Sequence, residues 1–72
     1  MDEKTMELVG IAASIAGHCR PCFHYHYGKA RELGISAEDM DQAIDLAVRI
    51  SASGDAKMLE FAQKEMKRGD EK

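Results

Sequence analysis

Hydrophobic residues recur along most of the chain at intervals of three and four, which is the period of an amphipathic α-helix. The first such stretch covers residues 4–17, and Gly17 is expected to end it because glycine readily adopts a left-handed conformation. Its apolar positions are Met6, Val9, Ala13 and Ala16, broadened by Leu8, Ala12 and Ile15. Strand-like alternation occurs only around residues 23–27. The pattern therefore predicts an all-α fold.

A second helix is expected to begin near Arg20 and to stop at Gly34. Pro21 fits its first turn, where a backbone N–H would have no partner within the helix. The apolar positions of this segment include Tyr27, Ala30 and Leu33.

Two more helices are predicted in the second half of the chain. Ser36 is a suitable N-cap for the third, residues 51–55 (Ser-Ala-Ser-Gly-Asp) are expected to break it, and the fourth is expected over about 56–67. The expected core positions are Met40, Ala43, Ile44, Ala47, Val48 and Ile50 in the third helix and Met58, Leu59, Phe61, Ala62 and Met66 in the fourth. Residues 68–72 are predicted to form a frayed, charged tail.

The predicted fold is thus a compact bundle of about four helices forming one domain over residues 1–72. A chain of this length buries only about 60% of its unfolded surface. Small domains of this kind usually gain stability from a disulfide, a metal or a partner subunit. We therefore expect the chain to assemble with copies of itself.

Composition and charge narrow the classes of partner and location. The formal net charge of −3 argues against nucleic acid or an anionic membrane as the main partner. The N-terminus is acidic where a secretory signal needs basic residues, and the apolar run over residues 8–16 is too short to span a bilayer. A cytoplasmic location is therefore expected, where a close cysteine pair is more often catalytic or metal-binding than structural.

Both cysteines and all three histidines of the chain lie within residues 18–26. Cys19 and Cys22 form a Cys-x-x-Cys motif, and His26 follows four residues after Cys22. If this segment is helical, Cys22 and His26 share a face, so the imidazole can accept the proton of the thiol. The start of a helix also favours a thiolate, because the positive end of the helix dipole lies there. Of the two cysteines, we expect Cys19 to be the more accessible.

A carboxylate behind the histidine would complete a proton relay. Glu7 is the candidate, because it is a charged residue set among the apolar positions of the first helix. With Glu7 twelve residues before Cys19, the chain resembles AhpD-like proteins, the alkylhydroperoxidase D branch of the carboxymuconolactone decarboxylase family. The resemblance rests on the spacing Glu7, Cys19, Cys22 and His26, together with Ala30, Gly34 and residues 36–40, and covers roughly residues 5–62.

The resemblance implies a thiol–disulfide oxidoreductase that reduces small hydroperoxides and needs no bound cofactor. Cys19 and Cys22 would be the redox pair, His26 the proton acceptor and Glu7 the outer member of the relay. In the family the second cysteine meets the peroxide and the first resolves it into a disulfide. The resemblance also implies an external dithiol or a peroxiredoxin-type partner, and assembly into dimers or trimers of dimers.

Other interpretations of the same residues remain open. Cys19, Cys22 and His26, with His18 or His24, are suitable zinc ligands, so a zinc-stabilised binding or assembly module without redox activity is the main alternative. A non-redox enzyme acting on lactones is another. His18 and His24 are otherwise expected to face solvent or an interface. Tyr25 and Tyr27 are expected to pack or to line a substrate entrance. Without the spacing of the family, Glu7 would be read as an ordinary surface glutamate rather than as a relay member.

Overall fold

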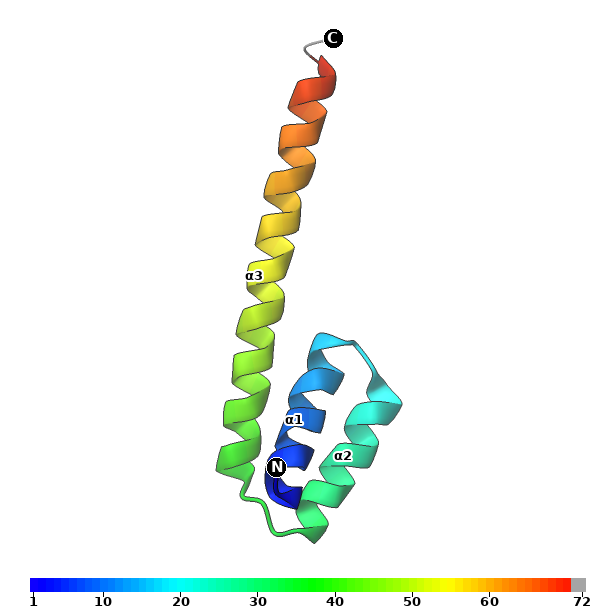
Figure 1. Ribbon diagram of the computed structural model, residues 1–72, viewed down its shortest axis with the longest axis vertical. Helices are drawn as coiled ribbons and strands as arrows, with labels where there is room; N and C mark the ends of the chain where they lie inside the picture. The colour runs from blue at the N-terminus through cyan, green and yellow to red at the C-terminus, as the bar shows by residue number, and fades with distance from the viewer. Residues whose placement is uncertain (71–72) are drawn as a thin grey trace.

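The computed structural model describes residues 1–70, which form three helices joined by two short turns. Helix α1 spans Glu3–Ala16, α2 spans Arg20–Glu32 and α3 spans Ala37–Asp70. Figure 1 shows α1 lying between the other two helices, with α3 continuing far beyond the hairpin that α1 and α2 form. No strand occurs within residues 1–70, so the prediction of an all-α fold is confirmed.

The ends of the helices follow from local side-chain chemistry. Asp2 is the N-cap of α1 and accepts a hydrogen bond of 2.7 Å from the backbone N–H of Thr5. This bond favours the charged carboxylate and so lowers the pKa of Asp2. Ser36 caps α3 in the same way, its Oγ accepting from the N–H of Asp39, as predicted. Gly34, with a φ of 75°, ends α2 in the left-handed conformation, also as predicted.

The predicted break between a third and a fourth helix is wrong. Both segments belong to α3, which runs without interruption through residues 51–55. Gly54 and its serine neighbours weaken a helix, by about 1 kcal/mol for glycine and less for serine. None of them lacks a backbone N–H as proline does, and Gly54 does not adopt a positive φ. The helix is therefore weakened here but not ended. It also includes residues 68–70 of the expected tail, whereas residues 71–72 lie outside the described part of the chain.

The hydrophobic core is small and lies where the three helices meet. Its buried members are Ile11, Ala30, Ile35 and Met40, and the partly buried residues packed against them are Leu8, Phe23, Leu33 and Ile44. The apolar stripe predicted for α1 is shifted, since Met6 and Val9 are about half exposed while Ile11 and Ser14 are buried. Almost the whole circumference of α1 is apolar, so its periodicity alone does not indicate which side packs.

The second half of α3 differs most from the compact bundle that was predicted. The side chains expected to be buried there are exposed in the single chain: Met58, Leu59, Phe61 and Met66. Ile50, earlier in α3, is exposed as well. The molecule measures 58 × 21 × 20 Å along its principal axes, which reflects the length of α3. None of the three described helices is both long and apolar enough to cross a membrane.

Candidate active site

The turn between α1 and α2 places Cys19 at the start of α2. Gly17 has a φ of −88°, so the left-handed residue of this turn is His18, with a φ of 54°, and not Gly17 as predicted. The N–H of Cys19 donates to the carbonyl of Ser14, and that of His18 donates to the carbonyl of Ile15. These are the two hydrogen bonds of a Schellman motif. The C-terminal cap of α1 therefore leads directly to the first cysteine.

Cys19 is the N-cap of α2, and Cys22 lies in the first turn. The two residues form a disulfide, with their Cα atoms 5.2 Å apart. The backbone N–H of Cys22 also donates a hydrogen bond of 3.3 Å to the Sγ of Cys19. Pro21 lies between them in the first turn of the helix, as predicted. Both sulfurs are thus next to the unpaired N–H groups at the positive end of the helix dipole.

The exposure of the two cysteines is the reverse of what was expected. Cys22 is exposed in the single chain, whereas Cys19 is only partly exposed. Cys19 lines a groove beside α3, whereas Cys22 lies in the open first turn of α2, where Arg20 and Pro21 are exposed as well. The helical spacing of the two cysteines can be predicted from the sequence. Their exposure cannot, because it depends on which side of the turn is covered by distant parts of the chain.

Glu7 and His26 meet across the α1–α2 interface. The Oε2 of Glu7 lies 2.6 Å from the Nδ1 of His26, although the two residues are 19 positions apart in the sequence. The side chain of Glu7 is only 19% exposed and that of His26 is 35% exposed. An ionised carboxylate only accepts hydrogen bonds, so this contact assigns the ring proton to Nδ1. The Nε2 atom of the neutral imidazole is then left as a proton acceptor.

Gly10 makes this arrangement possible, although it is not among the site residues expected from the sequence. A Cβ atom on residue 10 would lie 2.5 Å from Nδ1 and 2.6 Å from Cγ of His26. Only a residue without a side chain therefore allows the imidazole to lie against α1. The signal in the sequence was a glycine in the middle of a helix, three residues after the candidate carboxylate. Such a glycine usually has a packing or functional reason.

One aromatic side chain, that of Tyr25, lies against His26 in α2. The ring of Tyr25 is 5.0 Å from that of His26, and Phe23 stacks on Tyr27 at 5.6 Å. Tyr25 is 52% exposed, so it limits solvent on one side of the imidazole without covering it. His24 is exposed, as predicted.

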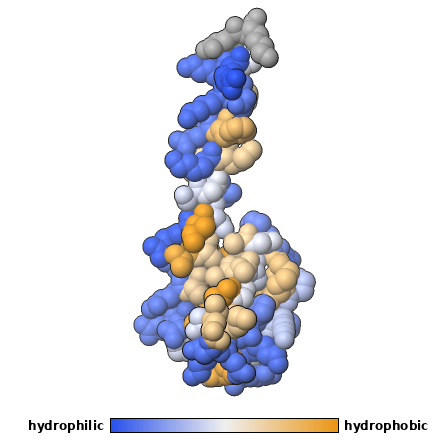
Figure 2. Space-filling model, in the orientation of Figure 1, coloured by the Kyte–Doolittle hydropathy of each residue, from blue (hydrophilic) through white to orange (hydrophobic). Residues whose placement is uncertain are grey.

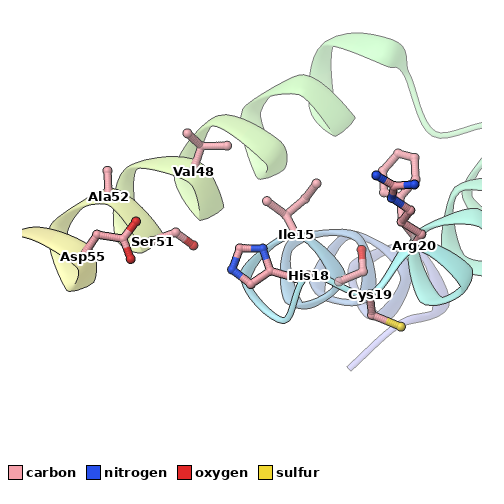
Figure 3. A pocket seen from close by; sticks show the side chains of 10 residues that line it. Ile15, His18, Cys19, Arg20, Val48, Ser51, Ala52 and Asp55 are labelled. Carbon is pink, nitrogen blue, oxygen red and sulfur yellow. The ribbon is translucent and has the colours of Figure 1, made fainter. Parts of the chain in front are cut away.

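A groove of about 810 Å³ lies between the α1–α2 turn and α3, and Cys19 forms part of its lining. Its polar lining includes His18, Arg20 and Asp55, and its apolar lining includes Ile15 and Val48. Figure 3 shows the His18 ring on the side of the groove toward Ser51 and Asp55, and the Cys19 sulfur pointing away from α3.

The residues suggested as zinc ligands do not converge. Among the described residues, no group of three or more histidine, cysteine, aspartate or glutamate side chains is placed to hold a metal ion. Both sulfurs bond to each other, and Nδ1 of His26 bonds to Glu7. The geometry therefore gives no support to a Cys₂His₂ site.

Comparison with known proteins identifies the family of the chain. A search of curated proteins and a search of solved structures gave no match. The sequence profile of the carboxymuconolactone decarboxylase family matches residues 1–64, which include both helices of the site and most of α3. The chain therefore belongs to the carboxymuconolactone decarboxylase family.

Proposed function

We propose that the protein is a thiol–disulfide oxidoreductase of the AhpD-like type, with Cys19 and Cys22 as its redox pair. The observation that supports this most strongly is the combination of two features at the start of α2. A Cys-x-x-Cys pair lies at disulfide distance at the N-terminus of α2, and His26, one turn further along α2, bonds to Glu7 of α1. Together they contain a dithiol that can open and close and a base to handle its proton.

His26 is the proton acceptor in this proposal, and Glu7 is a positioning residue. Cys22 and His26 are four residues apart in α2, so both project from the same face of the helix. Since Nδ1 is held by Glu7, the free Nε2 accepts the proton of the Cys22 thiol. The negative charge of Glu7 then stabilises the imidazolium that forms.

With a hydroperoxide as substrate, the Cys22 thiolate attacks the terminal peroxide oxygen and the O–O bond breaks. Cys22 becomes a sulfenic acid, and the alkoxide takes the proton from His26 and leaves as an alcohol. The thiol of Cys19 then attacks the sulfenic sulfur, releasing water and closing the disulfide. An external dithiol restores the pair by two thiol–disulfide exchanges and leaves as a disulfide.

The same pair can also exchange with an external disulfide without any peroxide. We propose a small dithiol or a peroxiredoxin-type protein as the redox partner. The cytoplasm, the location expected from the sequence, is a reducing compartment in which such dithiols persist.

Thiol counting and intact mass on the purified chain test this proposal. The reduced protein should show two titratable thiols, and one equivalent of hydroperoxide should remove both with a loss of about two mass units, as closing a disulfide releases two hydrogens. Addition of a dithiol such as dihydrolipoamide should restore both. Two thiols that survive peroxide and disulfide treatment, or stoichiometric zinc that protects them, would contradict the proposal and support the zinc-stabilised module.

A further inference from the structure

Helix α2 carries an excess of positive charge in a chain that is acidic overall. It has three basic residues, Arg20, Lys29 and Arg31, and one acidic residue, Glu32, so its net charge is +2. The whole chain has a net charge of −3, which leaves −5 on the residues outside α2. Lys29 and Glu32 pair with each other at 3.7 Å, so the excess comes from the two arginines.

Arg20 is the arginine that lies beside the cysteines. It is the first residue of α2, between Cys19 and Cys22 in the sequence, and it is exposed. A cation is disfavoured at the positive end of a helix dipole, and the first turn of α2 contains no acidic residue to offset this. The ion pairs within residues 1–70 do not include Arg20. The described part of the chain therefore gives Arg20 no carboxylate partner, and an anionic group of another molecule would supply one.

The groove beside α3 has a basic end and an acidic end. Arg20 and His18 line it near the start of α2, and Asp55 lines it on α3. Figure 3 shows Asp55 at the opposite end of the groove from Arg20, with His18 between them in this view. Its walls include Ile15 and Val48, and Figure 2 shows hydrophobic residues open to the viewer where the hairpin lies against α3. The end of the groove beside the disulfide thus combines positive charge with apolar surface.

Cys22, the more exposed cysteine, lies outside this groove. Neither this groove nor the one lined by Leu8 and Arg49 includes Cys22 in its lining. Small-molecule sites are concave and enclose most of their ligand. A sulfur on open surface suits a protein or peptide instead, because such a partner brings its own contact surface. Figure 3 shows the Arg20 side chain extending toward α3 and the Cys19 sulfur pointing away from it, so a partner that uses both spans the first turn of α2.

We propose that Arg20 selects the redox partner, and that the partner it favours is a protein or peptide with acidic residues two or three positions from its reacting cysteine. The proposal rests on the thiol–disulfide function given above. An extended chain advances about 3.3–3.6 Å per residue, so such a carboxylate lies roughly 7–11 Å from that cysteine. The Cα atoms of Cys19 and Cys22 are only 5.2 Å apart. The partner's sulfur can therefore meet Cys22 while its carboxylate binds the Arg20 guanidinium at the groove.

The reaction with such a partner is thiol–disulfide exchange. The Cys22 thiolate attacks one sulfur of the partner's disulfide, that S–S bond breaks, and the other sulfur leaves as a thiolate and takes the proton held by His26. Cys19 then gives up its proton and attacks the Cys22 sulfur of the mixed disulfide. The Cys19–Cys22 bond closes, and the partner's remaining sulfur leaves and takes up a proton. Two electrons and two protons thus pass to the partner, and Arg20 acts only by positioning it.

Charge-matched peptides test this selection. Three peptides of equal length carry the same internal disulfide, with glutamate, glutamine or lysine at the second and third positions outside each cysteine. The rate constant for reduction of each peptide by the reduced chain is divided by its rate constant with neutral dithiothreitol, which corrects for the reactivity of the disulfide itself. In about 0.01 M salt the corrected constant should be about tenfold or more higher for the glutamate peptide than for the lysine peptide, despite the net negative charge of the chain. In about 1 M salt, where the Debye length falls from about 30 Å to about 3 Å, most of this preference should disappear.

Variants of the two arginines assign the preference to one residue. Arg20→Gln should lower the ratio of the glutamate to the glutamine peptide to about one or below, whereas Arg20→Lys, which keeps the charge, should retain part of it. Any effect of a substitution on the thiols cancels, because the ratio compares peptides on the same variant. Arg31→Gln is the matched control, since it removes the same charge about 16 Å further along α2 and should leave the ratio within about twofold.

The outcomes separate this proposal from the function on which it rests. Equal corrected constants for the three peptides, or a preference that survives Arg20→Gln, would overturn the selection by Arg20 and leave the thiol–disulfide function intact. A chain that reduces none of the peptides and no small neutral disulfide would contradict that function, and this proposal with it.

Discussion

Gly10 and His26 approach each other more closely than any side chain on residue 10 would allow. An alanine Cβ would lie 2.5 Å from Nδ1 of the imidazole, the atom that bonds to Glu7. The glycine is therefore part of how His26 is held, even though it has no group that reacts. It lies three residues after Glu7, so α1 supplies both the carboxylate and the space beside it.

Gly10→Ala should slow the reaction of the reduced protein with hydroperoxide or iodoacetamide by about tenfold or more, because the displaced imidazole loses the contact with Glu7 that orients it as the proposed base. In an unobstructed helix the change would stabilise by up to about 1 kcal/mol. Here we expect a loss of about 1–3 kcal/mol instead, as for other overpacked sites. Thiol kinetics and urea unfolding measure the two effects.

Gly28→Ala is the matched control. Gly28 lies inside α2, and a Cβ there would meet nothing within 4 Å. We expect this variant to be more stable than the wild type by up to about 1 kcal/mol and to react at the wild-type rate. Equal stabilisation by both alanines would show that the Gly10–His26 contact is not required.

Glu7→Gln should slow alkylation of the reduced thiols at neutral pH with little loss of helix content. The amide can still accept the Nδ1 proton, but it no longer supplies the negative charge that stabilises an imidazolium. We therefore expect the rise of the alkylation rate with pH to move to higher pH. Iodoacetamide kinetics across the pH range measure this, with circular dichroism as the folding control. Unchanged kinetics would identify Glu7 as a structural residue only.

The sequence predicts the local chemistry of this chain better than its packing. The Cys-x-x-Cys pair, the Ser36 cap and the Gly34 stop depend on neighbouring residues, and the structure has them as expected. The side of α1 that packs and the continuity of α3 depend on distant surfaces, which periodicity does not specify. The contact between Glu7 and His26 spans two helices, so the sequence offered only the place of Glu7 among apolar residues and the family spacing as grounds for choosing that carboxylate.

His18→Gly should stabilise the protein by about 1 kcal/mol. The αL conformation of residue 18 costs a residue with a Cβ about 1–2 kcal/mol, and glycine removes this strain. Part of that gain is lost, because glycine gives the unfolded chain more conformational entropy. The equivalent position after α2 is already glycine, Gly34. Thermal and urea unfolding of oxidised protein measure the gain, and His18→Ala, which keeps the strain, should show none. If both variants are equally destabilised, the imidazole itself stabilises the turn.

The two cysteines are expected to have different roles, and two influences compete to decide which reacts first. Cys19 is the N-cap, and its sulfur accepts the N–H of Cys22, so the helix start favours a thiolate there. Cys22 shares a helical face with His26 and is the more exposed of the two. The dipole contributes about 0.3–1 kcal/mol at an exposed site, whereas a positioned general base contributes about 10²–10⁴-fold in rate. The base should dominate, and Cys22 should therefore be the thiol that attacks.

Single-cysteine variants separate the two roles. Cys19→Ser should react once with hydroperoxide at Cys22 and remain as a sulfenic acid, because no second thiol is present to resolve it. Cys22→Ser should lose peroxide reactivity while keeping an alkylatable thiol at Cys19. Mass spectrometry after one equivalent of hydroperoxide and a sulfenic-acid trap such as dimedone identifies the modified residue. A trapped adduct on Cys19 in the Cys22→Ser protein, with none on Cys22 in the Cys19→Ser protein, would reverse the assignment and make the helix start, not His26, the main activating influence.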